Sequence, residues 1–381
     1  MRLSIVTGFF LPVPATKGGA TERSWYGLAK LFAAAGHSVT FVSRRSGDSP
    51  REEWADGVKH VRVRGFDHSR SLALNLLLDL VWGFRVARAL PVGDVVICNT
   101  LTLPAWLGRV KPSAGKVCVM IGRNPKGQVA FYRGVARIYA PSTFMASQIR
   151  QDWASSRTKV IGYPIEWGLF ASRSHQSTAP LTIGFVGRLH REKGMDLLIR
   201  AARILFATSD LPPWRLRIVG PHLVAEGGEG SAWLQALKRE SESLGNRVEW
   251  VGPEFDPQAL ADIYGSMDIF CYPSVAERGE TFGVAVAEAM AAKCAVVVSG
   301  LACFSDLVVD GETGLVFDHR SCAPERALAE QLERLARDGV LRTTLAAKGQ
   351  QRVRRYDYPE VSRTVLDDLS DLTGAKGAPS Q

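Results

Sequence analysis

The residues best suited to chemistry lie in the segment 273–291, which contains two glutamates, Glu280 and Glu288, with seven residues between them. Gly279 and Gly283 lack a side chain, so a ligand can approach the main chain closely there. The segment follows an apolar run and opens a predicted helix, and the free amides at the start of a helix attract anions. Although isolated glutamates are usually surface residues, this setting predicts an anion site, with Glu280 reaching into a ligand cleft.

A second candidate segment, residues 184–196, ends a predicted strand at Gly187 and continues with two cations, Arg188 and Lys193, before the next helix. Two cations at the carboxyl end of a strand suit a diphosphate, because each charge-assisted hydrogen bond is worth about 1.5–3 kcal/mol. The alternative for this segment, taken alone, is a basic turn between strand and helix.

A third segment, Lys17-Gly18-Gly19-Ala20-Thr21, follows the first predicted strand. Its double glycine also allows close approach of a ligand to the backbone. It is not a Gly-x-Gly-x-x-Gly dinucleotide fingerprint, because the loop of residues 9–17 is too long for one.

Short apolar runs alternate with amphipathic helical stretches, and these elements must position the three segments. Strands are predicted at 38–43, 58–64, 94–98, 116–121 and 159–162, and then at 182–186, 215–219, 248–251, 269–272, 295–299 and 314–317. Helices are predicted at 21–35, 195–206, 231–244, 259–265, 283–292 and 324–336. This alternation favours parallel sheets covered by helices on both faces.

The apolar periodicity is interrupted at residues 171–180, which have the composition of a linker. We therefore expect an α/β protein of two Rossmann-like, doubly wound domains that face a cleft. The N-terminal domain is expected to span residues 1–170 and the C-terminal domain residues 181–355. Residues 356–381 are expected to pack back on the N-terminal domain.

Charge is distributed unevenly along the 381 residues, whose net charge is +9. Residues 1–170 carry 23 Lys and Arg against 10 Asp and Glu, whereas residues 171–381 carry 24 against 28. The first half therefore has a net charge of +13 and the second half −4. This asymmetry suggests an anionic partner for the first half, the alternative being a solvated surface without a partner.

The most apolar stretch, residues 72–90, is interrupted by Asn75, Asp79, Arg85 and Arg88, so it falls short of the ~18 apolar residues of a membrane span. It is predicted to be a buried helix, with a membrane-surface helix as the alternative. No two of the six cysteines have Cys-x-x-Cys spacing, which argues against a zinc ribbon, and a reducing cytoplasm is the expected compartment.

Together these segments resemble glycosyltransferase family 4, the retaining group 1 glycosyltransferases of GT-B fold, over nearly the whole chain. The matching parts are the family's Gly-Gly turn, its Val-Gly-Arg-Leu-x-x-x-Lys-Gly motif, its Ile-Val-Gly segment and its paired glutamates. They correspond to Gly18-Gly19, residues 186–194, residues 218–220, and Glu280 with Glu288.

The resemblance implies a donor site for a nucleoside-diphosphate sugar in the C-terminal domain and an acceptor site mainly on the N-terminal domain. Three residues would serve catalysis: Arg188 and Lys193 by holding the diphosphate, and Glu280 by binding hydroxyls of the transferred sugar. Glu288 would bind the ribose. The other expected donor-binding residues contribute backbone groups: Gly18, Gly19, Gly187, Gly220, Thr281, Phe282, Gly283 and Val284.

Two features of the sequence bear on the chemistry that the family implies. No Asp-x-Asp occurs, so neither a metal nor another cofactor is expected, and cations would neutralise the leaving diphosphate. The histidines that many members carry on the acceptor side are replaced by Ile121 and by Asn99-Thr100. Acceptor-side catalytic residues therefore cannot be carried over, and Arg123 is either an electrostatic substitute or a surface residue.

The function expected is transfer of a sugar, with retained anomeric configuration, to a glycan, lipid-linked or small-molecule acceptor. The alternatives are a nucleotide-sugar epimerase, a phosphorylase, or a non-enzymatic binder of an anionic polymer. No nucleic acid is expected as a partner, because no aromatic-rich RNA-binding signature accompanies the charge. Peripheral contact of the basic N-terminal domain with an anionic membrane, at its inner face, is a further hypothesis.

Overall fold

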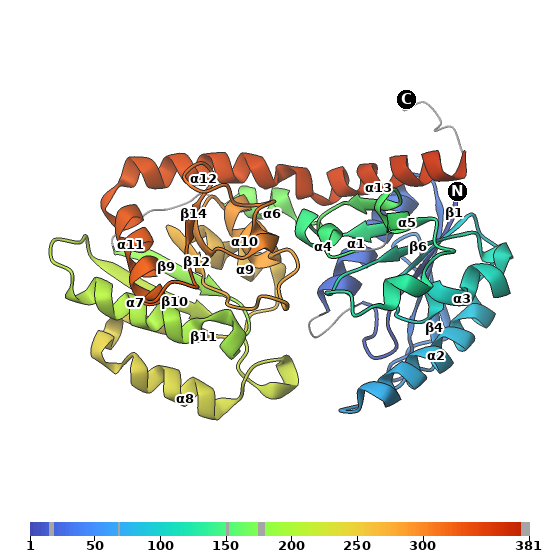
Figure 1. The fold of residues 1–381 in the computed structure, drawn as a ribbon, viewed down its shortest axis with the longest axis horizontal. Coiled ribbons are helices and arrows are strands. Elements are labelled where there is room, and N and C mark those ends of the chain that lie inside the picture. Colours follow the sequence, from blue (N-terminus) through green and yellow to red (C-terminus); the bar gives the residue numbers. More distant parts are fainter. Residues whose placement is uncertain (15–18, 68, 150–151, 174–179, 375–381) are drawn as a thin grey trace. The chain divides into compact units, whose positions relative to one another are not determined.

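The chain is described by a computed structural model that covers residues 1–14, 19–67, 69–149, 152–173 and 180–374. It divides into two compact units (Figure 1). Unit 1 comprises Met1–Pro164 and Tyr358–Gln381, and unit 2 comprises Ile165–Asp357. Both are Rossmann-like α/β units, as predicted.

The unit boundary lies before residue 170, because the short helix α6 (Trp167–Ala171) packs within unit 2. Ile165 pairs with Asp357, and the indole nitrogen of Trp167 donates a 3.1 Å hydrogen bond to the carbonyl of Gln350. Most of the expected linker, residues 174–179, lies outside the described residues.

Unit 1 is built on an eight-stranded sheet of order β3-β4-β2-β1-β5-β6-β7-β8. The strands are β1 (Arg2–Val6), β2 (Ser38–Arg44), β3 (Glu52–Ala55), β4 (Val58–Val63), β5 (Val95–Cys98), β6 (Lys116–Met120), β7 (Arg137–Ala140) and β8 (Thr158–Val160). Neighbouring strands pair in parallel except β3, which is antiparallel to β4. Strands β3 and β7 were not predicted; β3 is mostly exposed and contains two glutamates, so no apolar run marks it.

The helices of unit 1 are α1 (Ala20–Ala34), α2 (Leu72–Ala89), α3 (Leu103–Val110), α4 (Thr143–Ser147), α5 (Asp152–Ser155) and α13 (Tyr358–Thr373). Helix α13 is anchored by Asp368, whose buried carboxylate accepts hydrogen bonds from Arg137 (2.9 Å), Tyr139 (2.8 Å) and Lys159 (3.1 Å). These three residues lie on β7 and β8, so the C-terminal helix is pinned to the edge of the sheet.

The prediction that residues 72–90 form a buried helix is wrong for the first half of α2. Leu72 is 65% exposed and Leu77 is 56% exposed, and Leu74 and Leu76 are exposed as well. The buried stripe of the helix begins only at Asp79 and continues through Trp82 and Val86, so the first two turns find no core to pack against. Among the described residues no helix is long and apolar enough to cross a membrane.

Unit 2 contains a parallel six-stranded sheet of order β11-β10-β9-β12-β13-β14. The strands are β9 (Leu181–Val186), β10 (Trp214–Val219), β11 (Val248–Gly252), β12 (Ile269–Tyr272), β13 (Ala295–Ser299) and β14 (Leu315–Phe317). Chain order runs outward in both directions from the β9–β12 pair. That pair is therefore the topological switch point, where open α/β sheets bind ligands beyond their carboxyl ends.

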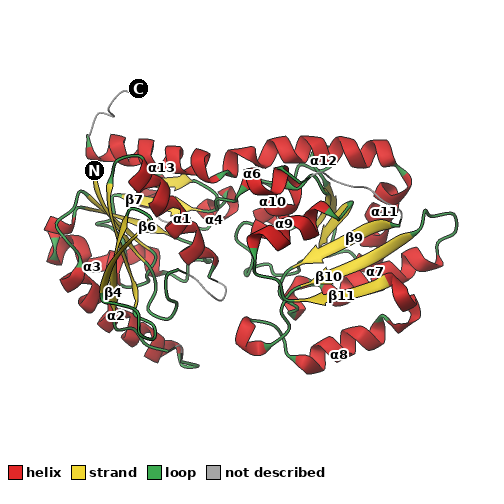
Figure 2. Cartoon of the chain, turned by 180° about the vertical axis from the view of Figure 1, so that it is seen from behind, coloured by secondary structure: helices red, strands yellow, loops and turns green. Residues whose placement is uncertain are grey.

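Two layers of helices cover the sheet of unit 2 (Figure 2). On one side α7 (Met195–Ala207) contacts α8 (Ser231–Glu240) and α11 (Pro324–Arg337). On the other, α10 (Val284–Ala291) contacts α6 and α12 (Gly339–Val353), and α6 contacts α9 (Pro257–Gly265). Helices α7 and α10 begin directly after the loops that follow β9 and β12, so the fold places both predicted donor segments at the switch point.

Candidate functional site

The two predicted donor segments meet in unit 2 because a glycine allows their backbones to touch. Gly194 has a left-handed φ of +66°, and a Cβ there would overlap the carbonyl oxygen of Pro273. The carbonyl oxygen of Glu192 also accepts a 2.8 Å hydrogen bond from the amide of Val275. The loop after β9 is thereby joined to the loop after β12.

Lys193 and Glu280 form a buried ion pair at this junction, with their side chains only 7% and 9% exposed. The hydroxyl of Ser274 lies 3.1 Å from the same Glu280 oxygen. The Lys193 ammonium lies 5.5 Å from the centre of the Tyr272 ring. Burial and the neighbouring Glu280 raise the pKa of Tyr272 well above its ordinary value, so its phenol stays protonated.

Arg188 points to a different set of partners. Its Nη1 donates a 2.9 Å hydrogen bond to the carbonyl of Gly227, and its Nη2 donates one of 3.1 Å to Glu192. The side chain is 45% exposed. A guanidinium has five N–H donors, so these two hydrogen bonds leave others to bind a ligand at the end of β9.

The start of α10 lies in the same segment as Glu280. Gly283 precedes the helix in a left-handed conformation, with φ +96°, and a Cβ there would crowd the ring of Phe304. The ring of Phe282 is buried against Tyr356, with centroids 4.9 Å apart. This packing fixes Thr281, Phe282, Gly283 and Val284 at the helix N-terminus, where the helix dipole favours an anion.

Glu288 lies on the second turn of α10, beyond the helix N-terminus. One of its carboxylate oxygens accepts a 3.1 Å hydrogen bond from the hydroxyl of Tyr264 on α9. Burial and this carboxylate raise the pKa of Tyr264 well above its ordinary value. Glu288 is partly exposed, so it keeps a surface for a ligand next to α9.

The other glycines that were predicted to bind the donor occupy different places in the fold. Gly220 follows β10 with φ +145°, and a Cβ there would overlap the carbonyl of Gly187, so both strand ends depend on the missing side chain. Gly19 belongs to unit 1, where it precedes α1 with φ +86°. Gly18 lies outside the described residues.

In unit 1, other residues stand at the carboxyl ends of β5 and β6, where many family members carry acceptor-side histidines. Ile121 is buried, and Arg123 is exposed. Asn99 Oδ1 and Thr100 Oγ1 are buried without a hydrogen-bond partner among the described residues. Nearby on α1, burial raises the pKa of Glu22, an effect that the positive charge of Arg123 partly opposes.

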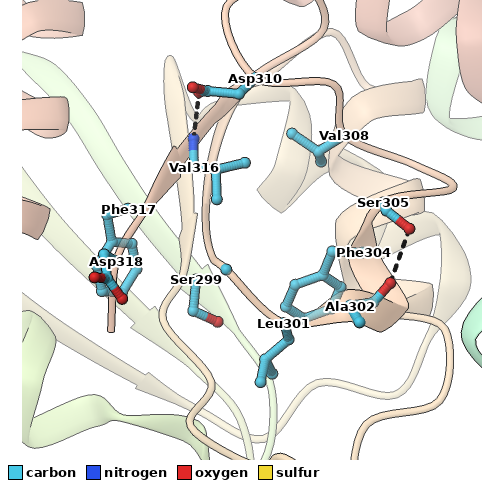
Figure 3. A pocket seen from close by; sticks show the side chains of 11 residues that line it. Ser299, Leu301, Ala302, Phe304, Ser305, Val308, Asp310, Val316, Phe317 and Asp318 are labelled. Atoms are coloured by element: carbon cyan, nitrogen blue, oxygen red, sulfur yellow. Dashed lines mark hydrogen bonds between the residues drawn. The ribbon is translucent and has the colours of Figure 1, made fainter. Parts of the chain in front are cut away.

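A cavity of about 540 Å³ lies farther along the same edge of the unit 2 sheet, beyond β13 and β14 (Figure 3). Phe304, Val308 and Val316 form apolar walls, and Asp310 and Asp318 lie at its margin. It is connected to the donor segments through Ser299, whose hydroxyl donates a 2.5 Å hydrogen bond to the carbonyl of Ser274. Across the described ranges, no group of three or more His, Cys, Asp or Glu could hold a metal ion.

Three residues of the site were not predicted: Tyr272, Ser274 and Glu192. Tyr272 and Ser274 flank Pro273 at the end of β12, and Glu192 precedes Lys193 in the second segment. Their places beside the motif residues were a usable signal, and Glu192 lies only four residues from its partner Arg188. The contacts of Tyr272 with Lys193 and of Ser274 with the Glu192 carbonyl instead depend on the meeting of two loops about 80 residues apart in sequence.

Comparison with known proteins shows similarity to one family of enzymes. Residues 180–338 match the family described as glycosyl transferases group 1. The phosphatidyl-myo-inositol mannosyltransferase of Mycobacterium leprae is 29% identical, and the alignment covers 96% of each chain. The chain is therefore similar to the group 1 glycosyltransferases, with the family match itself lying in unit 2. A D-inositol 3-phosphate glycosyltransferase of Corynebacterium urealyticum is 30% identical over 49% of this chain and 42% of its own.

Solved structures show the same fold for this glycosyltransferase. Sucrose-phosphate synthase from Thermosynechococcus elongatus superposes with a TM-score of 0.78 at 19% identity, covering 99% of this chain and all of its own. Anabaena Alr3699/HepE, solved in complex with UDP, gives a TM-score of 0.71 at 18% identity, covering 97% of this chain and 100% of its own. The expected GT-B class is thereby confirmed; the cleft expected between the domains stays a prediction.

Proposed function

We propose that this glycosyltransferase takes its sugar from a nucleoside-diphosphate donor bound to unit 2 and transfers it with retained anomeric configuration. The observation that carries the proposal is the convergence of Arg188, the Lys193–Glu280 pair and the start of α10 at the topological switch point. A diphosphate needs cations and free amides, and a sugar needs a carboxylate that accepts from its hydroxyls. The site supplies all of these within one unit.

The proposed roles follow from the position of each group. Arg188 and the helix start bind the diphosphate, and Lys193 turns from Glu280 toward it when the donor enters. Glu280 then accepts hydrogen bonds from the transferred sugar. Glu288, one turn into α10, binds the ribose. A contact between the Gly19 backbone amide and the phosphates, which the family resemblance implies, stays a prediction.

In the proposed reaction the acceptor oxygen attacks the anomeric carbon while the bond to the diphosphate breaks on the same face. The departing phosphate takes the acceptor's proton, and the two cations stabilise its developing charge without a metal. Losing one such contact typically lowers the rate about 10²–10³-fold. Activity that EDTA abolishes and magnesium or manganese restores would contradict this part of the proposal.

The proposed acceptor is an anionic inositol phosphate headgroup. It is supported by the charge of the first half of the chain, where residues 101–150 contain eight Lys and Arg and no Asp or Glu. It is also supported by the names of the relatives, which act on phosphatidyl-myo-inositol and D-inositol 3-phosphate. The buried, unpartnered oxygens of Asn99 and Thr100 could bind hydroxyl groups of such an acceptor after a small local adjustment.

For a lipid-borne acceptor, the exposed first turns of α2 are the proposed membrane contact. They present Leu72, Leu74, Leu76 and Leu77 to solvent, and each buried CH₂ group contributes about 0.8 kcal/mol on entering an apolar phase. Arg88 is exposed on the same helix. A basic residue near an anionic surface adds about 1 kcal/mol, so peripheral binding at the inner membrane face is proposed.

A thermal-shift screen with nucleoside diphosphates and their sugars tests the donor proposal, because a ligand at 100 times its Kd adds about 2.7 kcal/mol of stability. Turnover assays with inositol phosphates and phosphatidylinositol vesicles then test the acceptor. Donor consumption without a glycosylated product would favour an epimerase instead.

Liposome co-sedimentation tests the membrane contact. Binding should rise with the fraction of anionic lipid and fall between low and physiological salt. The variant Leu72→Ser/Leu76→Ser should lose binding, whereas Val340→Ser, which alters an exposed valine on α12, should not. Equal recovery of the wild-type protein from neutral and anionic vesicles would exclude the membrane contact.

A further inference from the structure

Glu192 occupies an unusual place, because its main chain and its side chain both contact donor segments. Its carbonyl oxygen accepts a hydrogen bond from the Val275 amide and lies 3.0 Å from the Ser274 hydroxyl. The same hydroxyl lies 3.1 Å from the carboxylate of Glu280, so Ser274 links Glu192 to the proposed sugar-binding residue.

The side chain of Glu192 extends between the two loops. One carboxylate oxygen lies 3.1 Å from Nη2 of Arg188. The other lies beside Gly279, where a Cβ would come within 3.3 Å of it. The absence of a side chain at Gly279 therefore leaves room for the carboxylate to stay against the arginine.

Arg188 is held from two sides by this arrangement. The carbonyl of Gly227 binds Nη1 and the carboxylate of Glu192 binds Nη2, which fixes the plane of the guanidinium. A long arginine side chain that is about half exposed otherwise samples many rotamers, and binding a ligand would have to order it. Prior ordering removes that cost from the binding step.

The negative charge of Glu192 works in the opposite direction, since it repels a diphosphate. Its side chain is 32% exposed, however, and its charge is paired with Arg188. Water and this arginine screen the repulsion. We therefore expect the orienting effect to exceed the electrostatic cost.

We propose that Glu192 is a positioning residue that orients Arg188 for the donor diphosphate. This inference rests on the proposed function of Arg188. It goes beyond the residues that the motifs indicate, because Glu192 acts through the arginine rather than on the donor.

A double-mutant cycle on nucleoside-diphosphate affinity tests the inference. Affinities of UDP, GDP and ADP are measured by calorimetry for the wild type, Glu192→Ala, Arg188→Ala and the double variant. Glu192→Ala should weaken binding about tenfold in the wild-type background and leave it unchanged in the Arg188→Ala background, because the residue acts through the arginine. In turnover, Glu192→Ala should lower kcat/KM by about 10–100-fold, the range expected of a misplaced group.

Two further variants separate orientation from charge and from folding. Glu192→Gln keeps an oxygen that accepts from Arg188, so its affinity should stay within about threefold of the wild type. Glu226→Ala removes a charge from an exposed position in the loop that carries Gly227, and its affinity should not change. Thermal unfolding of each ligand-free variant shows whether a loss of affinity reflects misfolding.

Several results would overturn the inference. Equal weakening by Glu192→Ala in both arginine backgrounds would mean that the residue supports the loop rather than Arg188. Tighter binding in Glu192→Ala and Glu192→Gln alike would mean that repulsion dominates. If the wild type bound no nucleoside diphosphate, both the proposed donor function and this inference would be wrong. If the wild type bound one and the effects of the two substitutions were additive, only the role of Glu192 would be refuted.

Discussion

Removing Lys193 while Glu280 remains should destabilise unit 2, because a carboxylate would be left buried without its partner. Both side chains are more than nine-tenths buried. Breaking a buried ion pair on one side costs about 3–5 kcal/mol. Unit 2 spans Ile165–Asp357, and in domains of 150–250 residues each kcal/mol shifts Tm by about 2–4 °C. Lys193→Met should therefore lower the Tm of unit 2 by about 6–20 °C.

The second variant, Lys193→Met/Glu280→Gln, should recover most of this loss, since no unpaired charge remains in the buried site and the amide can still contact Ser274. Differential scanning calorimetry of the full chain without ligand measures both effects. Lys348→Met, which replaces an exposed lysine on α12, is the matched control.

A Tm of Lys193→Met within about 2 °C of the control would refute the reasoning, and so would a double variant no more stable than the single one. The outcome also decides how activity data should be interpreted. Arg188→Ala removes no buried partner, so its loss of turnover reports on the diphosphate contact directly, whereas Lys193 variants first need correction for the folded fraction.

Asp368→Ala should destabilise unit 1 by about 1.5–3 kcal/mol in urea unfolding, because Arg137 and Lys159 lose a charged hydrogen-bond partner but remain partly exposed to water; a change below about 1 kcal/mol would show that α13 is held by apolar contacts alone. Burial lowers the pKa of His60 in the folded state. As the pH falls below about 6.5, the unfolded chain therefore takes up a proton on this histidine before the folded chain does. The free energy of unfolding should then decrease, by at most about 1.4 kcal/mol per pH unit. In His60→Phe that part of the pH dependence should disappear from urea midpoints measured at pH 7.5 and 5.5. Glu280→Gln should reduce turnover more than binding of the bare nucleotide, whereas Glu288→Gln should weaken that binding; calorimetry that gave the reverse pattern would exchange the two roles.

The alternation of apolar runs and amphipathic helices was enough to predict two parallel α/β units, because burial on both faces of a sheet imposes that pattern locally. The same holds for the segments around Arg188 and Glu280, which follow strands that end at one edge. Strand β3 escaped prediction because it is mostly exposed and contains two glutamates, so it has no apolar run. Helix α2 was misjudged because apolar residues dominate both of its halves, whereas only the second half is buried in the tertiary structure.

The sequence by itself determined the order of the elements, the family and the residue types at the donor site. Only the tertiary structure decided which of those residues touch. Lys193 and Glu280 are 87 residues apart in sequence, and their pairing requires Gly194 to lie against Pro273. The contact of Arg188 with the Gly227 carbonyl likewise depends on two loops packing together, whereas Glu192 lies only four residues from the arginine. Such contacts arise from the close approach of backbones at a sheet edge, and local sequence patterns carry no information on that distance.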